Sequence, residues 1–243
     1  INNNADNRVI TGSGTSGTLN GESGLIFDGS KLGIGATPTL ALDISSTDPR
    51  IYMIDTTNAG STYKTKFGQY NDTFLISTND GANDAIKIYA TGEVSKPLQP
   101  TFLVNVSSDS VHPNLPTGVT IIDFGSEAYD VGSNVSSVGV FTAPVTGKYQ
   151  FNTSMAFAQI TSSTTLLEVF IKASNREMRG CLQNVANLQA GDYQSFGFST
   201  MVDMDANDTC FVQVAITGGG GTIDVISGST PAPLSFFSGT LIC

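Results

Sequence analysis

The chain has 243 residues and a formal net charge of −10, and only 13% of its residues are charged. The negative charge repels phosphate backbones and anionic membrane surfaces, so we expect no nucleic-acid binding and no membrane insertion. Glycine is abundant, with 26 residues, and the apolar residues show no helical spacing. This composition favours short strands joined by many turns, and we predict an all-β fold.

Residues 1–40 contain few large apolar side chains, and these are diluted by Gly and Asn. A single copy would bury too little apolar area to offset the conformational entropy lost on folding, about 1–2 kcal/mol per residue for the backbone. The segment is therefore either disordered or completed by strands from other chains. Residues 25–34 favour the second outcome, because two short apolar runs flank an Asp28-Gly29 turn, which is a strong hairpin signal. We predict a fibre-shaft segment of intertwined strands.

Residues 41–94 carry short runs that are rich in β-branched and aromatic residues, at 51–54, 66–70, 73–76 and 85–89. Turn-forming residues separate these runs at 58–60, 69–72 and 79–81. The pattern predicts a small antiparallel module of four or five strands. Two prolines in the segment 95–101 indicate an extended linker between this module and the remainder of the chain.

Residues 102–243 show longer strands with sustained alternation. The alternating apolar stripes include Tyr149, Phe151, Met155 and Phe157 in one strand, Leu167, Val169 and Ile171 in a second, and Cys210, Val212, Val214 and Ile216 in a third. Alternation of this kind predicts a β-sandwich. Phe170 and Phe211 fall on the opposite faces of these strands, so we expect both faces of some strands to be covered, partly by neighbouring subunits.

The sequence Phe141-Thr142-Ala143-Pro144-Val145-Thr146-Gly147-Lys148-Tyr149-Gln150-Phe151 resembles the Phe-x5-Gly-x-Tyr-x-Phe motif of the complement C1q/tumour-necrosis-factor jelly-roll family. The spacing of Phe124 and Asp130, the opening strand at Pro100–Val104 and the closing strand at Phe237–Ile242 also fit that family. Val135 and Thr153 replace residues that are usually aromatic, and Asn207 stands where Gly is usual. The resemblance implies a C1q-like jelly-roll head over 102–243 in a homotrimer, with Tyr149, Phe151 and Phe237 in structural roles.

The stretch Thr18–Gly35 resembles the connecting segments of bacteriophage tail fibres, particularly those of marine phages such as cyanophages. That resemblance implies an extracellular virion protein whose trimeric head adheres to a glycan or protein receptor on the bacterial host. The chain starts with Ile1, so we expect a preceding region that joins other tail or baseplate proteins. Three alternatives stay open: a structural spacer or capsid-decorating fibre without a receptor, a glycan depolymerase tailspike, and a secreted cellular C1q-like adhesin.

Catalytic side chains are scarce. The single histidine, His112, precedes a proline, and we expect it to be a surface-loop residue rather than part of a nucleophilic site. Two carboxylate pairs, Glu127 with Asp130 and Asp203 with Asp205, could in principle hydrolyse glycosides, but both fall at expected turns. We therefore predict a binding protein that is not an enzyme.

Metal and cofactor motifs are similarly weak, and we predict none. The run Asp203–Asp208 resembles a loose calcium loop without its turn Gly or its terminal Glu, and Gly218–Gly221 lacks the Lys of a phosphate-binding loop. Three cysteines, Cys181, Cys210 and Cys243, have no metal-ligand spacing, and we expect them to be buried apolar side chains. No individual receptor-binding residue is identified. Contacts are expected from three loops, which are Ser107–Thr117, Asn175–Asp192 and Gly218–Pro233.

Overall fold

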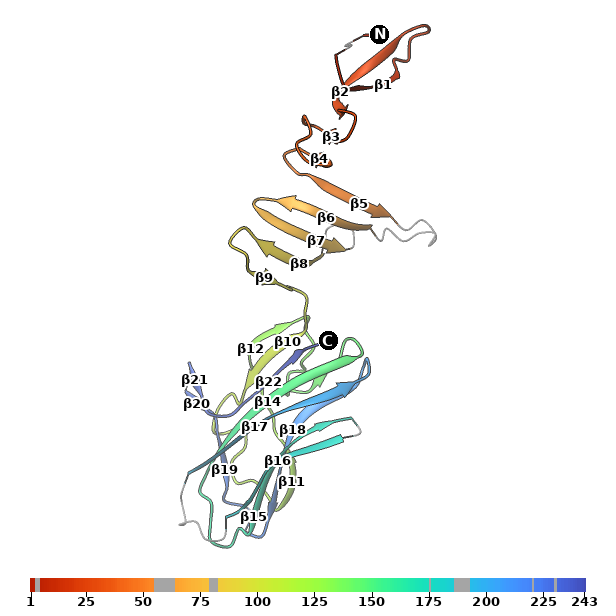
Figure 1. Cartoon of the computed structure of the whole chain (residues 1–243). Coiled ribbons are helices and arrows are strands. Elements are labelled where there is room, and N and C mark those ends of the chain that lie inside the picture. Colours follow the sequence, from red (N-terminus) through yellow and green to blue (C-terminus); the bar gives the residue numbers. More distant parts are fainter. Residues whose placement is uncertain are drawn as a thin grey trace. The chain divides into compact units, whose positions relative to one another are not determined.

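The computed structural model describes residues 1–2, 5–54, 64–78, 83–174, 176–185, 193–219, 221–229 and 231–243. Every regular element in these residues is a β-strand, which confirms the predicted all-β class. The chain separates into two compact units, Ile1–Pro97 and Leu98–Cys243 (Figure 1). The turns expected at 58–60 and 79–81 lie outside the described residues.

The N-terminal unit consists of two sheets. The first has the order β1-β2-β3-β4 and the second the order β5-β6-β7-β8-β9. Their strands are β1 (Arg8–Gly12), β2 (Leu19–Phe27), β3 (Leu32–Ile34), β4 (Leu42–Ile44), β5 (Arg50–Ile54), β6 (Lys64–Tyr70), β7 (Thr73–Thr78), β8 (Asn83–Tyr89) and β9 (Val94–Ser95). The second sheet is antiparallel throughout, which confirms the predicted module of four or five strands.

The predicted hairpin at Asp28-Gly29 is confirmed. Strands β2 and β3 pair antiparallel across it, and Gly29 has a φ of 97°, a conformation that side chains with a Cβ rarely adopt. The Asp28 Oδ1 atom accepts hydrogen bonds from the backbone N–H groups of Ser30 (3.0 Å) and Lys31 (2.8 Å). These bonds favour the charged carboxylate, so they hold the pKa of Asp28 below its usual value.

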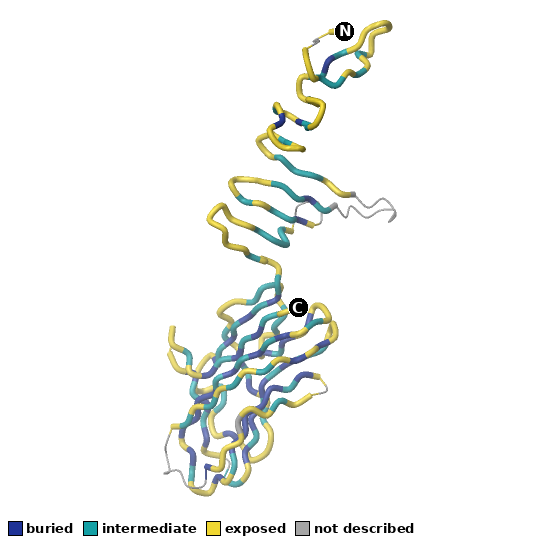
Figure 2. Tube along the Cα trace, viewed as in Figure 1, coloured by how far each residue is buried: buried dark blue, intermediate teal, exposed yellow. Residues whose placement is uncertain are grey.

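The two units differ sharply in their cores. Every buried hydrophobic side chain among the described residues lies between Phe102 and Phe237, and none belongs to the N-terminal unit. Figure 2 shows this difference, with buried residues concentrated along the strands of the C-terminal unit. The sheets of the N-terminal unit thus have no hydrophobic core in the part of the chain that the structure describes.

The C-terminal unit, called the head below, is a two-sheet sandwich. Its strands are β10 (Thr101–Asn105), β11 (Gly118–Ile121), β12 (Ser126–Val131), β13 (Phe141–Thr142), β14 (Gly147–Ala158), β15 (Leu166–Ala173), β16 (Arg176–Asn184), β17 (Gln194–Met204), β18 (Thr209–Thr217), β19 (Asp224–Ile226), β20 (Gly228–Ser229), β21 (Ala232–Pro233) and β22 (Phe236–Leu241). One sheet has the order β12-β10-β22-β14-β17 and the other the order β11-β18-β15-β16.

This strand order is that of a jelly roll. Strand β18 pairs with β15 along one edge, and with both β11 and β13 along its other edge. The eight main strands are, in chain order, β10, β13, β14, β15, β16, β17, β18 and β22. The first, eighth, third and sixth of them form one sheet, and the second, seventh, fourth and fifth form the other. Two interlocked Greek keys produce this arrangement, so the predicted jelly-roll head is confirmed.

The core between the sheets is dominated by aromatic rings. Phe102 packs 5.0 Å from Phe141 and 5.1 Å from Phe237 between ring centroids, and Phe151 lies 5.7 Å from Phe237. Gly239 makes this packing possible, because a Cβ atom there would come within 2.6 Å of the Phe102 and Phe151 rings. The alternating stripes predicted for β14, β15 and β18 all face this core.

The expectation that both faces of some strands are covered is confirmed at Phe170, and here the cover comes from the same chain. Phe170 is only 2% exposed although it lies on the outer face of β15, because Arg179 of β16 places its guanidinium 5.3 Å from the ring centroid. Arg179 also forms a 2.8 Å ion pair with Glu168. The same chain therefore buries this ring through a cation–π contact. Phe211 is partly exposed.

We expect Phe102→Ala to destabilise the head by about 3–5 kcal/mol, because it removes a ring that touches three others and leaves a cavity. Met201→Ala, at a side chain that is 55% exposed, should change stability by less than about 0.5 kcal/mol. Chemical denaturation followed by intrinsic fluorescence measures both changes. Equal effects of the two substitutions would contradict the assigned core.

Candidate functional site

Two of the three loops expected to contact a receptor lie side by side. Backbone hydrogen bonds of 2.7 Å run from Leu115 N to Ile223 O and from Gly221 N to Leu115 O. The Asp109 carboxylate accepts hydrogen bonds from the backbone and the hydroxyl of Ser227, at 2.6 and 2.7 Å. Residues about 110 positions apart thereby form one surface. In the third loop, Asn175 and residues 186–192 lie outside the described residues.

A cavity of about 250 Å³ opens beside these two loops, between β10, β12 and the β20–β21 hairpin. Its lining is uncharged and rich in hydroxyl groups, with Leu103, Val106, Ala128 and two prolines as apolar contacts. The Oδ1 atom of Asn105 is buried without a hydrogen-bond partner, which leaves one strong acceptor in the lining residues. Such a lining suits a small neutral ligand that carries hydroxyl groups.

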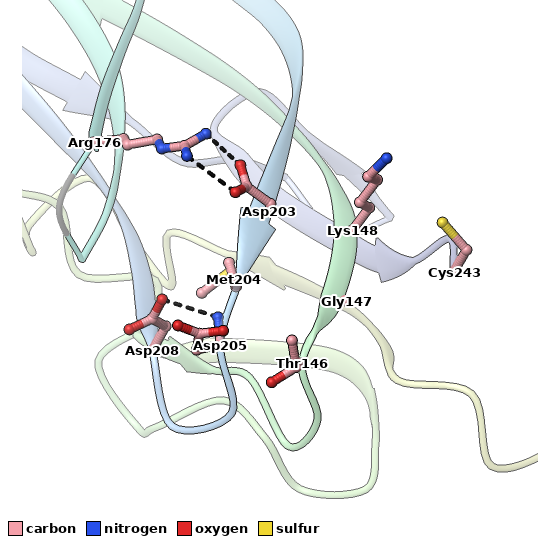
Figure 3. Close-up of a pocket in the computed structure, with 9 residues that line it drawn as sticks. All are labelled: Thr146, Gly147, Lys148, Arg176, Asp203, Met204, Asp205, Asp208 and Cys243. Carbon is pink, nitrogen blue, oxygen red and sulfur yellow. Dashed lines mark hydrogen bonds and ion pairs between the residues drawn. The ribbon is translucent and has the colours of Figure 1, made fainter.

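A second cavity, of about 330 Å³, is lined by charged residues at the β17–β18 turn (Figure 3). Asp203 forms a two-point ion pair with Arg176, in which the second hydrogen bond is 3.0 Å long. Asp205 and Asp208 lie together at the turn, where the backbone N–H of Asp205 donates to the Asp208 carboxylate at 3.1 Å. The carboxylates of Asp203 and Asp208 therefore already have partners. The first joins β16 to β17, and the second orders the β17–β18 turn.

The calcium-loop alternative for Asp203–Asp208 gains no support from this geometry. Asp203 faces Arg176 and not the other two carboxylates (Figure 3). Across the described residues, no group of three or more His, Cys, Asp or Glu side chains is arranged to hold a metal ion. Gly220 of the glycine tract lies outside the described residues; Gly218 and Gly219 pack against the backbone of residues 163–165.

The carboxylates of the other pair, Glu127 and Asp130, have different surroundings. Asp130 accepts a 2.7 Å hydrogen bond from the backbone N–H of Val135, so it orders the turn that follows β12. Glu127 lies on an exposed part of β12. Both residues lie within β12, so the expectation that this pair falls at a turn is wrong, although the Asp130 carboxylate orders the turn that follows.

His112 has a structural role that the sequence did not indicate. The ring is partly buried, not a surface group, and its Nε2 atom accepts a 2.7 Å hydrogen bond from the backbone N–H of Asp123. Burial lowers the pKa of His112, and the nearby Asp123 carboxylate opposes this change only in part. The folded protein therefore favours the neutral ring, which joins two loops of the head.

The three cysteines do not share one environment. Cys210 is fully buried in the core, and burial raises the pKa of its thiol well above the usual value. Cys243 is exposed and lines the charged cavity, so the expectation of burial is wrong for this residue. The side chain of Cys181 lies outside the described residues.

No family model matches the chain, and no curated protein matches it. Solved structures similar to it include the globular domain of zebrafish complement 1qA, at 14% identity and a TM-score of 0.42, over 60% of this chain and 98% of that one. Murine APRIL at pH 8.0 is 13% identical with a TM-score of 0.38, over 59% and 99% of the two chains. Eiger TNF from S. frugiperda is 14% identical with a TM-score of 0.37, over 60% and 92%.

We expect the free energy of unfolding to fall as the pH drops through about 6.5, because unfolded chains bind a proton on His112 more readily than the folded head does. The stability that this difference contributes is fully present above the pKa of His112 in the unfolded chain, and it is lost as the pH falls below that value. Melting temperatures between about pH 7.5 and pH 5.5 measure it. His112→Gln should show a shallower decrease than the native chain, and parallel curves would contradict the assignment.

Asn207 stands at the turn position where the C1q-like motif usually has Gly. Its φ is 74°, a left-handed conformation that Gly adopts freely and that Asn tolerates better than most other residues. We expect Asn207→Gly to change stability by less than about 0.5 kcal/mol and Asn207→Val to destabilise the head by about 1–2 kcal/mol. Urea unfolding of the two variants checks this difference. Equal stability of both variants would show that the turn does not require positive φ.

Proposed function

We propose that this protein is a trimeric bacteriophage tail-fibre protein that attaches the virion to the surface of its bacterial host. The head carries the receptor contacts, and other tail or baseplate proteins are the further partners of the fibre. The observation that carries the proposal is the unequal burial in the two units. The head has a complete jelly-roll core, whereas the N-terminal unit buries no hydrophobic side chain in its described residues.

An adhesive role is supported by the chemistry of the head. Of its two adjoining loops, 107–117 is mostly exposed and the described residues of 218–233 are exposed in part, and loops on a rigid scaffold are the usual carriers of binding residues. The hydroxyl-lined cavity next to them suits a neutral glycan unit on the bacterial surface. Weak single sites become strong when three are joined in one fibre and several fibres act together.

Binding of the fluorescently labelled full chain to intact marine bacteria, cyanobacteria included, tests this proposal. Binding and competition with phage adsorption are the expected results. Ser229→Trp, which fills the uncharged cavity, should weaken binding at least tenfold, about 1.4 kcal/mol. Val145→Trp, at a residue outside that cavity that is 47% exposed, serves as the control.

Two results would contradict the proposal. Failure to bind any strain or to reduce adsorption would favour a structural spacer without a receptor. Release of oligosaccharides from purified host polysaccharide would instead identify a depolymerase.

A further inference from the structure

The five-stranded sheet of the N-terminal unit has one continuous apolar face. Cross-strand pairing aligns Ile51 with Phe67, Phe67 with Ile76, and Ile76 with Ile86 in a single row. Side chains two residues away lie on the same face, because alternate residues of a strand point the same way. The apolar face therefore consists of Ile51, Met53, Phe67, Phe74, Ile76, Ile86, Ile88 and Val94, together with the uncharged polar side chains of Thr65, Gln69 and Thr78. The described part of the chain buries none of them, and Met53 and Val94 are 54% and 61% exposed.

The opposite face of the same sheet carries charged side chains, and those that the structure describes there each contact a neighbouring side chain. Lys66 lies 4.8 Å from the centroid of the Tyr52 ring, and Arg50 lies 5.1 Å from that of Tyr70. Asp84 forms a 3.0 Å ion pair with Lys87 and accepts a 2.7 Å hydrogen bond from Ser77. The sheet therefore has one charged face and one apolar face, and the described residues of one copy bury no side chain of the apolar face.

The first sheet repeats this asymmetry. The register of β2, β3 and β4 aligns Leu25, Ile34 and Ile44 in one row and Phe27, Leu32 and Leu42 in the next. Both rows lie on one face, since their members are two residues apart in each strand. Phe27, Ile34 and Leu42 are 50%, 42% and 51% exposed. Two successive sheets thus present large apolar side chains that need a cover.

We propose that other copies of this chain cover the apolar face of residues 50–95, so that the face forms a self-association interface that is separate from the head. Three copies would arrange their apolar faces around a common axis, with the polar faces outward. The threefold number rests on the proposed function. The location of the interface rests on the strand register and on side-chain exposure.

Copies of the chain meet the requirements of this face better than a foreign partner. The apolar face contains no charged side chain, so several copies of a chain with a net charge of −10 can meet there without bringing like charges together. The covering surface must be flat, apolar and matched to two successive sheets. Identical chains aligned in register present the same two apolar sheet faces to one another, because symmetric assemblies repeat every contact.

Chemical cross-linking tests the interface directly. Ile76→Cys places a thiol at the centre of the apolar face, in the middle strand of the sheet, and Leu75→Cys places one on the polar face next to it. Both variants are made in the full chain with Cys243→Ser, because Cys243 is exposed. A short bis-maleimide should join copies of Ile76→Cys on the order of tenfold more efficiently than copies of Leu75→Cys, since neighbouring thiols act at high effective concentration.

The outcomes separate this interface from the proposed function. A solution mass of three chains without preferential cross-linking at residue 76 would overturn the interface and leave a trimer formed by the head. A solution mass of 25.4 kDa, that of one chain, would overturn the interface outright. Cross-linking at residue 76 in a chain that binds no bacterial cell would support the interface and overturn the adhesive role. A solution mass of two chains together with preferential cross-linking at residue 76 would overturn the threefold number alone.

Discussion

The structure depends on one constraint, which is that each β-strand presents two faces and a continuous apolar face must be covered. In the head, two sheets cover each other, and Phe102, Phe141, Phe151 and Phe237 fill the space between them. The outer face of the β14 sheet is mostly polar, with residues such as Gln150, whose amide donates a 2.6 Å hydrogen bond to Ser199. The N-terminal sheets are equally amphipathic but have no second layer in the described chain.

This difference divides the tasks of the molecule. A head with its own core can hold loops in fixed positions, as the contacts of Asp109 with Ser227 and of Leu115 with Ile223 show. A unit without a core of its own is stable only where something else covers it. Loop surfaces of the head are therefore the natural place for specific recognition, and the apolar sheet faces are the natural place for assembly.

Much of the fold could be predicted, because the strand period of two exposes the inward stripe of β14 and the Asp-Gly turn marks the β2–β3 hairpin. The candidate site could be predicted only as loops. The uncharged cavity combines Leu103 with Ser227, and the charged cavity combines Lys148 with Arg176, so neither forms a local pattern. The environments of Phe170 and His112 were missed because their partners, Arg179 and Asp123, are identified only by register and loop path.

The sequence by itself determined the all-β class, the jelly-roll motif around Phe141–Phe151 and the poverty of apolar residues before residue 41. These features are local or periodic, so they can be recognised from the order of residues along the chain. Only the tertiary structure decided which strands pair, and through that register it collected Ile51, Phe67, Ile76 and Ile86 into one face. An apolar run reveals that a strand has something to bury, but the alignment of neighbouring strands decides whether those side chains form a surface.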